Sequence, residues 1–538
     1  MKLKRHELKD PKKWEEMGIK LPQFDIDKVI DETKKNPRWV HFGAGNIFRG
    51  FIAMLQQTLL NKGLADSGII AVESYDFEVH DKIYVPYDNL GLLVIMNSDG
   101  TLEKEVVGSI SDILLADPSN KENWDRLNEI FSNPSLQIVS MTITEKGYNL
   151  KDFAGNFIKE VMEDIEAGPE NPKNVVSKLV SLVYSRYKKG EYPLALVSLD
   201  NFSGNGERLY SAVMTIAEEW SNKGFVDKGF TQYLNDPSKI SFPLTMIDKI
   251  VPRPHELVKK SLEEKGLEDM NIIKTSKNTV IAPFVNAERA QYLVIEDKFP
   301  NGRMKLEEAG VLLTDKETVE KVERMKVTTC LNPLHTALAI YGCLLDYKTI
   351  ADEMKDDCLR KLVEKIGYVE GMPVVINPKV LDPEEFIKEV IEVRLPNPYM
   401  PDTPQRIATD TSQKMGIRFG ETIKSYIHRS DLDVNDLKFI PLVIAGWCRY
   451  LMGIDDEGNQ MDLSPDPLLN DLKSHVSNIR LGDVDSVKDN LRPILSNKEI
   501  FGLDLYEVGL GEKVESYFKE LISGTGAVRN TLKKYLEC

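Results

Sequence analysis

The chain has few cysteines, no paired metal-ligand motif and no long apolar run. Five of its 538 residues are cysteine, at positions 330, 343, 358, 448 and 538. This odd, scattered set argues against a disulfide framework and favours a reducing compartment, so we expect a cytoplasmic protein. No apolar run approaches the roughly 20 residues that a membrane span needs, and residues 1–6 lead into no apolar signal core.

The composition points to an ordered globular protein with an acidic surface. Hydrophobic residues make up 42% of the chain and charged residues 29%, which is typical of a globular protein. The formal charge of −16 argues against nucleic-acid binding, and an anionic substrate would need a local basic pocket. His and Cys residues are scattered without close ligand pairs, so we expect no metal site.

Apolar patterns divide the chain into two parts. Near-continuous apolar strands at 39–42, 69–72, 136–143 and 194–199 alternate with helical segments, and the pattern at 92–96 and 105–107 predicts a hairpin around a turn at 97–100. After about residue 300, helices are expected near 333–346, 357–366, 383–394, 435–452 and 514–535. We therefore predict an α/β fold: a Rossmann-like, mostly parallel sheet domain at 1–295 with a helical lead-in, and a large all-helical C-terminal domain at 296–538.

A glycine turn after the first strand is typical of dinucleotide binding. Gly43 and Gly45 supply the first two positions of the fingerprint, while Phe48 stands in place of the third glycine. Glu73 ends the second strand, where an acid binds the adenosine ribose. Residues 74–78 contain no Arg or Lys for a 2′-phosphate, which favours NAD over NADP. A plain turn and a solvated strand end are the alternative interpretations.

A second signal is the polar cluster KVTTCLNPLH at 326–335. Lys326 could take the proton from an alcohol whose carbon loses hydride, and Asn332 could donate an N–H to the developing oxyanion. His335 shares the helix face of Asn332. Pro333 suits a first helical position, so we expect Asn332 to cap that helix. The alternative is structural: a capping Asn, a surface Lys and a satisfied core His.

With these residues in view, the chain resembles the polyol-specific long-chain dehydrogenases, the group that contains mannitol 2-dehydrogenase, fructuronate reductase and tagaturonate reductase. The similarity runs in order from about residue 38 to about 430. Its segments are HFGAGNIFR (41–49), VSMTITEKGY (139–148), SLDNFSGNG (198–206), FPLTMID (242–248), VIEDKFPNGR (294–303), the 326–335 cluster, RLPNP (394–398) and DTSQK (410–414).

The resemblance implies roles for individual residues. Lys326 takes the place of the family's general base, and Glu323 that of a glutamate that relays protons. Asn201 and Asn332 match the family's oxyanion site, and His335 matches the residue that orients the substrate. Asp248 matches an acid near the proton path, and Arg406 and Lys414 match substrate-binding residues. The cofactor-binding positions are Gly43, Gly45, Asn46, Ile47 and Glu73. Arg406, Asp410 and Lys414 are also spaced as a helical salt-bridge ladder, which is the structural alternative.

One departure bears on the base. The family usually has four residues between the lysine and the asparagine, and this chain has five, Val327 to Leu331. In a regular helix one added residue turns the lysine by about 100°. A bulge or helix break near 328–332 must therefore absorb it, helped by Pro333. Otherwise Lys146 becomes the candidate base.

The first hypothesis is an NAD-dependent oxidoreductase that interconverts a keto-uronate (fructuronate or tagaturonate) and its aldonate (mannonate or altronate), with a lysine acid–base and no metal. Arg406, Lys414 and Arg418 could pair with the substrate carboxylate. A second hypothesis is a mannitol 2-dehydrogenase-type enzyme acting on neutral polyols. The third is a non-catalytic NAD-binding relative, which the extra residue and Pro333 would support.

Overall fold

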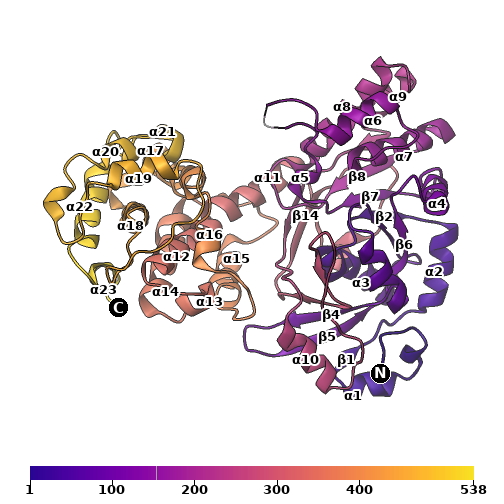
Figure 1. The fold of residues 1–538 in the computed structure, drawn as a ribbon, viewed down its shortest axis with the longest axis horizontal. Helices are drawn as coiled ribbons and strands as arrows, with labels where there is room; N and C mark the ends of the chain where they lie inside the picture. Colours follow the sequence, from indigo (N-terminus) through magenta and orange to yellow (C-terminus); the bar gives the residue numbers. More distant parts are fainter. Residues whose placement is uncertain (153) are drawn as a thin grey trace. The chain divides into compact units, whose positions relative to one another are not determined.

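The computed structural model describes residues 1–152 and 154–538, and the chain divides into two compact units (Figure 1). The first unit comprises Met1–Asn97 and Thr101–Val319, and the second comprises Ser98–Gly100 and Glu320–Cys538. The sequence prediction placed the division between residues 295 and 296. The first unit extends further because strand β15 (Leu312–Thr314) still pairs with β14 (Tyr292–Glu296) of that unit.

A six-stranded parallel sheet forms the centre of the first unit, as the apolar strands predicted. In spatial order its strands are β6 (Ile110–Leu115), β3 (Ile69–Glu73), β2 (Trp39–Phe42), β7 (Ile138–Met141), β8 (Leu194–Ser198) and β9 (Ile240–Ser241). All neighbouring strands run parallel. Alternate residues of β2, such as Val40 and Trp39, enter two different buried clusters. Both faces of the sheet are therefore covered, which explains the uninterrupted apolar pattern.

Smaller sheets complete the first unit. The predicted hairpin is confirmed: β4 (Gly91–Met96) and β5 (Leu102–Val107) pair antiparallel. They belong to a four-stranded sheet with β1 (Ile19–Lys20) and β13 (Phe284–Ala287). Strand β10 (Thr245–Asp248) pairs with β14, and a two-stranded sheet joins β11 (Ile273–Lys274) to β12 (Val280–Ile281).

Helices cover both faces of the large sheet. The α-helices of the first unit are α1 (Pro11–Glu16), α2 (Ile26–Lys35), α3 (Ala53–Asn61), α4 (Lys121–Phe131), α5 (Thr144–Gly147), α6 (Lys159–Ala167), α7 (Val175–Gly190), α8 (Asn205–Asn222), α9 (Lys228–Asn235) and α10 (Glu256–Glu264). Short 3₁₀ turns lie at η1 (Glu7–Lys9), η4 (Val85–Tyr87) and η5 (Leu306–Ala309), and π turns at η2 (Phe48–Ile52) and η3 (His80–Tyr84).

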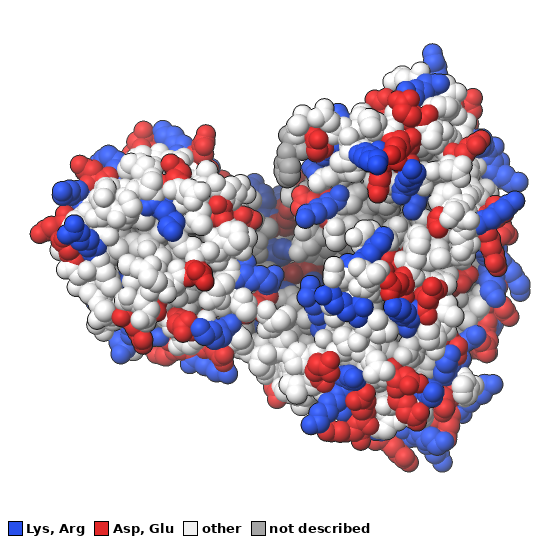
Figure 2. All heavy atoms as spheres, viewed as in Figure 1, with Lys and Arg blue, Asp and Glu red and all other residues white. Residues whose placement is uncertain are grey.

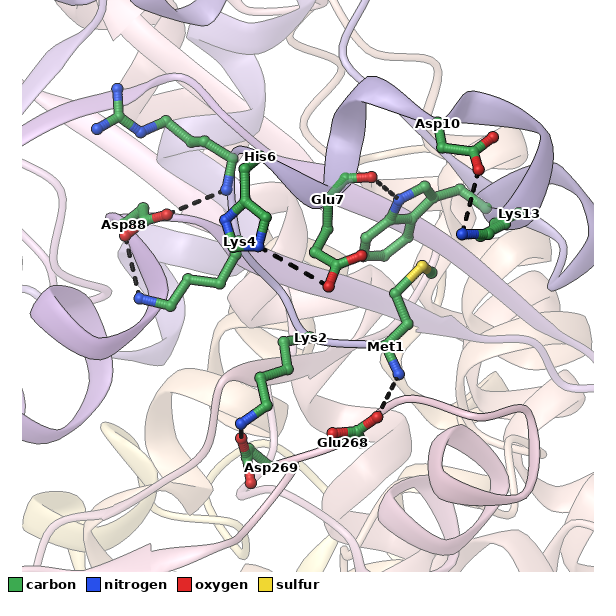
Figure 3. A network of polar contacts seen from close by, with 12 residues as sticks. Met1, Lys2, Lys4, His6, Glu7, Asp10, Lys13, Asp88, Glu268 and Asp269 are labelled. Carbon is green, nitrogen blue, oxygen red and sulfur yellow. Dashed lines mark hydrogen bonds and ion pairs between the residues drawn. The ribbon is translucent and has the colours of Figure 1, made fainter.

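The N-terminal segment packs onto the first unit through charged contacts (Figure 3). Met1 N pairs with Glu268 at 2.8 Å, and Lys2 Nζ pairs with Asp269 at 2.9 Å. Lys4 Nζ lies 3.1 Å from Asp88 Oδ1. The lead-in was expected to be helical throughout, but it also contributes the short strand β1, because residues 19–20 pair with β5.

The second unit is helical, in agreement with the prediction. The division between the two units falls within helix α11 (Lys316–Met325). The other α-helices of the second unit are α12 (Asn332–Leu344), α13 (Ile350–Glu353), α14 (Asp357–Glu364), α15 (Pro383–Glu389), α16 (Pro404–Ile407), α17 (Glu421–His428), α18 (Phe439–Tyr450), α19 (Leu469–Val476), α20 (Arg492–Leu495), α21 (Lys498–Phe501), α22 (Gly511–Leu521) and α23 (Ala527–Leu536).

Between these helices lie several turns of other types. The π turns are η6 (Lys326–Cys330), η7 (Lys365–Gly371), η9 (Val390–Arg394) and η11 (Gly416–Gly420). The 3₁₀ turns are η8 (Met372–Val374), η10 (Thr411–Gln413), η12 (Val434–Asp436) and η13 (Val484–Ser486). The single helix expected at 514–535 is two helices, α22 and α23. Gly526, with φ of 75°, breaks it by entering the left-handed region.

One disulfide is present, although the odd, scattered cysteines argued against a disulfide framework. Cys358 and Cys538 are bonded with their Cα atoms 5.3 Å apart, although 180 residues separate them. Packing of α14 against α23 brings the two cysteines together. The sequence around each cysteine does not predict this pairing. Cys330, Cys343 and Cys448 are free and buried.

The surface carries both signs of charge, interspersed on the face shown in Figure 2. Of the helices in the described residues, none combines the length and the apolar composition needed to cross a membrane.

Candidate functional site

The parallel sheet brings two predicted residues, Gly43 and Glu73, to one edge, together with Thr142 and Asp200, which the sequence analysis quoted only within motifs. Gly43 follows β2, Glu73 ends β3, Thr142 follows β7, and Asp200 is the second residue after β8. Because these four strands run parallel, all four residues lie at the carboxyl edge. The order β6-β3-β2-β7-β8-β9 reverses between β2 and β7, and ligands of such sheets bind at this point.

The two glycines of the turn are needed for different reasons. Gly43 has φ of 101°, and a Cβ there would lie 2.2 Å from the carbonyl oxygen of Thr142. Only glycine fits that position. At Gly45, apart from the glycine itself and its two neighbours in sequence, no atom of the described chain lies within 4 Å of an added Cβ. The space above Gly45 is therefore open, as a pyrophosphate approaching the backbone requires.

The residues after the glycines also fit a dinucleotide. Asn46 donates from Nδ2 to Val280 O at 3.4 Å, while its Oδ1 is buried and has no hydrogen-bond partner among the described residues. Ile47 is half-buried beside it. An unpartnered polar atom at the mouth of the loop is a site for a ligand donor. The helix expected from Asn46 to Asn61 is present as the π turn η2 followed by α3.

Glu73 is buried and holds the glycine loop in place. Its Oε1 accepts from the backbone N–H of Tyr75 at 2.8 Å and of Asp76 at 3.0 Å, and its Oε2 accepts from Ala44 N at 3.3 Å. Burial raises the pKa of this carboxyl despite these donors. Oε2 keeps a lone pair for one more donor, so the predicted ribose contact stays a prediction.

A lysine near this loop was missed by reasoning on residues 74–78 alone. Lys277, in the turn between β11 and β12, donates from Nζ to Tyr75 O at 2.5 Å and lies 4.2 Å from the centre of the Tyr75 ring. Thr275 Oγ1 donates to Asp76 Oδ2 at 2.6 Å. Contacts this distant in sequence leave no local pattern, so the local argument against a 2′-phosphate was incomplete.

The predicted oxyanion residue of the first unit follows the end of β8. Asn201 is exposed in a bend, directly after Asp200. The Asp200 carboxylate accepts from Ile143 N at 2.9 Å, from Thr144 N at 3.0 Å and from Tyr148 OH at 2.7 Å. Burial raises its pKa. Asp200 therefore fixes the residues flanking Asn201 to the loop after β7, a role that the sequence argument did not assign.

Asp248, predicted to lie near a proton path, ends strand β10 in the small sheet. It is buried, and its backbone partner in the sheet is Tyr292 of β14. Lys146, the substitute base, lies in α5 and is exposed.

In the second unit the extra residue after Lys326 is absorbed, as predicted. Helix α11 continues into the π turn η6, Lys326–Cys330, and Leu331 N donates to Lys326 O at 3.1 Å, five residues back. A π turn holds one more residue than an α turn, and such turns are frequent at functional sites. Lys326 is buried, with 4% of its surface exposed, and Glu323 is half-buried on α11 three residues earlier.

Asn332 does not cap its helix, which corrects the prediction. It is the first residue of α12, the N-cap position belongs to Leu331, and no side chain caps the helix. The extra residue is taken up in η6, so the helix begins one position earlier than Pro333 would suggest. Asn332 is half-buried, and its carbonyl accepts from Thr336 Oγ1 at 2.9 Å.

His335 presents an unpartnered nitrogen. Its Nε2 is buried and makes no hydrogen bond within the part of the chain that the structure describes. The nearest carboxylate oxygen, Asp402 Oδ2, lies 3.6 Å away, too far for a hydrogen bond. Burial lowers the pKa of His335 to about 3, and four nearby cations add to the shift. The imidazole is therefore neutral at physiological pH.

We call these four cations, Arg418, Arg406, Arg394 and Lys414, the basic cluster. Burial lowers the pKa of Arg418 to about 10 and that of Lys414 below its usual value. Arg418 donates to Thr336 Oγ1, one residue from His335 in α12. The cluster also contacts acids, because Arg406 pairs with Asp402, and Asp410 and Asp466 lie near Lys414.

The salt-bridge ladder considered for Arg406, Asp410 and Lys414 is not formed. Helix α16 ends at Ile407, and Asp410 has φ of 53°, which interrupts any helix. Arg406 pairs with Asp402 instead, and Lys414 Nζ donates to Thr409 O. Arg394, which the sequence argument quoted only within a motif, belongs to the cluster as well. The described residues contain no group of three or more His, Cys, Asp or Glu placed to hold a metal ion.

Two family models match the chain. The model described as "Mannitol dehydrogenase Rossmann domain" covers residues 37–308, and the one described as "Mannitol dehydrogenase C-terminal domain" covers residues 318–522. A relative named D-mannonate oxidoreductase, from Thermotoga maritima, is 60% identical over 536 residues, which is 99% of each chain.

Two solved structures of dehydrogenases are similar to the chain over nearly its whole length. A D-sorbitol dehydrogenase in substrate-free form has a TM-score of 0.77 and 27% identity, with 95% of this chain and 97% of that one covered. The mannitol 2-dehydrogenase of Pseudomonas fluorescens, in a ternary complex with NAD and D-mannitol, has a TM-score of 0.68 and 25% identity, with 100% of both chains covered.

Proposed function

The chain belongs to the mannitol dehydrogenase family, and from that premise we propose that it is an NAD-dependent oxidoreductase that interconverts D-mannonate and fructuronate. The relative named D-mannonate oxidoreductase, 60% identical over nearly the whole chain, supports the choice of this sugar acid. The glycine turn, with its required Gly43 and open space at Gly45, supports the choice of a dinucleotide.

One observation carries the choice of a sugar acid over a neutral polyol. The unpartnered Nε2 of His335 is buried among four cations, and burial lowers the pKa values of three of them, Arg418, Arg406 and Lys414. A bound carboxylate would offset their mutual repulsion and accept charge-assisted hydrogen bonds from them. A polyol such as mannitol is uncharged, so its binding would be stabilised much less by the basic cluster.

Each predicted residue of the site then has a role in the reaction. Lys326 Nζ takes the hydroxyl proton of mannonate during oxidation and returns it during reduction. The family resemblance gives Asn201 of the first unit and Asn332 of the second unit the role of donating an N–H to an oxygen that gains negative charge. Neutral His335 orients the substrate, while Arg406, Lys414 and Arg418 bind its carboxylate end. NAD, when bound, supplies the hydride acceptor.

The proton path and the cofactor contacts complete the assignment. Glu323, one helical turn before Lys326, passes the proton onward. The family resemblance gives Asp248 of the first unit a role near the proton path. Gly43, Gly45, Asn46, Ile47 and Glu73 hold the cofactor. The extra residue before Asn332 was the main reason to consider a non-catalytic relative, and the π turn η6 takes up that residue.

A product assay tests the proposal. Purified protein is incubated with NADH and either fructuronate or tagaturonate, and the aldonates are separated by chromatography. We expect mannonate from fructuronate as the main product. Faster reduction of tagaturonate would contradict the choice of epimer, and reduction of neither would contradict the function.

A variant pair tests the carboxylate site in the same assay. Arg418→Met should lower kcat/KM for fructuronate roughly ten- to hundredfold, as expected for a lost charge-assisted bond worth about 1.5–3 kcal/mol. Arg429→Met is the matched control, because Arg429 is exposed and pairs with Asp431 outside the cluster. Equal effects of the two changes would remove the basic cluster from substrate binding.

A further inference from the structure

His41 is a buried polar residue of β2 that has no role in the chemistry above. It has 0% exposed surface, and its ring stacks on Phe48 with centroids 4.5 Å apart and planes 9° apart. Its Nδ1 lies 2.7 Å from Ser140 Oγ, and its Nε2 lies 2.9 Å from Thr142 Oγ1. His41 therefore connects two positions of β7 and its loop across the point where the strand order reverses.

The donors and acceptors around His41 define one direction for these hydrogen bonds. Trp39 Nε1 can only donate, and it donates to Ser140 Oγ at 2.7 Å. The Ser140 hydroxyl is then free to donate to His41 Nδ1, which leaves the ring proton on Nε2. Nε2–H donates to Thr142 Oγ1, and the Thr142 hydroxyl in turn donates to Gly43 O at 3.4 Å.

In this direction each ring nitrogen and each hydroxyl proton of the chain has a partner. The opposite tautomer would place a second donor on Ser140 Oγ, and the Ser140 proton would lose its place in the chain. Burial supports a single neutral state, because it lowers the pKa of His41 to about 3. The buried chain thus ends in an oriented hydroxyl at the glycine loop.

Phe48 explains how the loop manages without a third glycine. In the fingerprint that glycine lets the helix pack closely on the strand, and here Phe48 takes its place. The first turn of the helix is the π turn η2, Phe48–Ile52, and the Phe48 ring packs flat on His41. His41 and Phe48 together fill the space that a close helix–strand contact would otherwise occupy.

We propose that His41 is a positioning residue of the cofactor loop, which fixes Thr142 and thereby the backbone of Gly43. Thr142 contacts Gly43 twice: its carbonyl oxygen occupies the space where a Cβ of Gly43 would lie, and its hydroxyl reaches Gly43 O. Without the His41 Nε2–H, the Thr142 hydroxyl loses its donor and keeps only its 3.4 Å contact with Gly43 O, while Thr142 N still donates to Phe42 O at 2.8 Å. The glycine loop is then less ordered before the cofactor binds. Ordering the loop on binding costs free energy, so the cofactor binds more weakly.

Binding of NADH without any sugar tests this role. His41→Phe keeps an aromatic ring on Phe48 but removes both nitrogens. We expect the dissociation constant for NADH, measured by nicotinamide fluorescence, to rise about tenfold, which equals about 1.4 kcal/mol. The KM for NAD should rise by a similar factor, with kcat changed less than about twofold, since ordering the loop acts on binding.

The control removes a buried hydroxyl elsewhere in the same unit. Thr33 Oγ1 lies 3.0 Å from Ser111 Oγ and accepts from Gly68 N at 2.8 Å, contacts that include no residue of the glycine loop. Thr33→Val should lower stability without changing NADH affinity. If both variants weaken NADH binding equally, or His41→Phe folds and binds NADH as the wild type does, the positioning role is wrong.

A measurement on the wild-type protein does not depend on a variant folding. In protein labelled with ¹⁵N-histidine, long-range ¹H–¹⁵N spectra distinguish Nε2–H from Nδ1–H and from the charged ring. The His41→Gln spectrum assigns the signal among the seven histidines. We expect Nε2–H from pH 5 to 9. An Nδ1–H or a charged ring would overturn the proposal, whichever sugar the enzyme uses.

Discussion

Lys326 is the residue on which the proposed chemistry depends most. Lys326→Ala should lower kcat for mannonate oxidation by roughly 10²–10⁴-fold, the usual contribution of a positioned acid–base group. Steady-state kinetics with NAD measure this effect. Cofactor binding should be retained, because the glycine turn belongs to the other unit.

The control for Lys326 is a lysine in an equivalent backbone position. Lys365 is also the first residue of a π turn, η7, but it is exposed. Lys365→Ala should leave kcat within about twofold, as is usual for an exposed site away from the chemistry. A Lys326→Ala enzyme with unchanged kcat would show that another group moves the proton.

Glu353 is a buried acid that the proposed reaction does not use. It has 0% exposed surface, and neither carboxyl oxygen has a hydrogen-bond partner in the described chain. Burial raises its pKa well above the usual value, with Asp356 adding to the shift. The folded protein therefore binds this proton more tightly than the unfolded chain. The contribution of Glu353 to stability is therefore greatest below about pH 4.3, the ordinary pKa of glutamate, and is lost as pH rises through the folded pKa.

Glu353→Gln should remove that pH dependence. The free energy of unfolding of the wild type should fall by up to about 1.4 kcal/mol per pH unit over the affected range. The variant should lack this slope and be the more stable protein at pH 8. Urea unfolding from pH 5 to 9 measures both, and exposed Glu499→Gln should behave as the wild type does. Parallel curves for the wild type and Glu353→Gln would show that Glu353 is charged or solvated.

At the scale of elements, π turns carry several residues of the site. Lys326 lies in η6, Arg394 in η9 and Arg418 in η11, and η6 packs against η7 and η11. A π turn widens the helix and changes the direction of the side chains that follow it. The basic residues thus leave their helices at places where the regular repeat is interrupted.

A pair of length variants tests the π turn η6. Deleting Val327 restores the family spacing and should convert η6 into an α turn, so activity should persist within about tenfold. Inserting one alanine after Val327 adds a second extra residue, which turns Lys326 by about 100° relative to Asn332, and activity should be lost. Circular dichroism controls for folding. Loss of activity in the deletion alone would show that the π turn itself sets the direction of Lys326.

Sequence patterns predicted the elements better than their ends and junctions. Apolar strands such as residues 39–42 and 194–199 are unambiguous because burial on both faces leaves one pattern. The need for a bulge near 328–332 followed from helix geometry alone. The cap at Asn332 and the ladder through Asp410 failed, because each assumed a regular helix where the backbone is π-helical or left-handed.

Contacts between distant segments were beyond any local pattern. Lys277 reaches Tyr75 from 202 residues away, and Asp200 binds the backbone of a loop 56 and 57 residues earlier. The basic cluster was only partly predicted: Arg406, Lys414 and Arg418 were named, and Arg394 was not. The unpartnered nitrogen of His335 is visible only once the neighbouring helices are packed.

At the scale of the whole molecule, the disulfide closes a very long loop. It joins Cys358 to Cys538 across 180 residues, and a cross-link of this kind typically contributes about 2–4 kcal/mol. A reductant should lower the melting temperature of the wild type. The double variant Cys358→Ser, Cys538→Ser should melt lower and show no response to reductant. Equal melting with and without reductant in both proteins would contradict a stabilising bond.

Net charge and substrate charge have the same sign. The chain carries −16, which repels an anionic sugar acid at a distance. The basic cluster supplies the opposite sign locally, and charges near a buried group act through a lower effective dielectric than charges across the surface. Under the proposed function, the preference for a sugar acid would therefore depend on a few residues of one unit rather than on the charge of the whole protein.

The most direct test compares two alcohols in one enzyme preparation: kcat/KM for D-mannonate and for D-mannitol, both with NAD. If a substrate carboxylate binds the basic cluster beside His335, mannonate should be preferred by at least roughly tenfold, the equivalent of about 1.4 kcal/mol. A preference for mannitol, or equal values for the two, would contradict it.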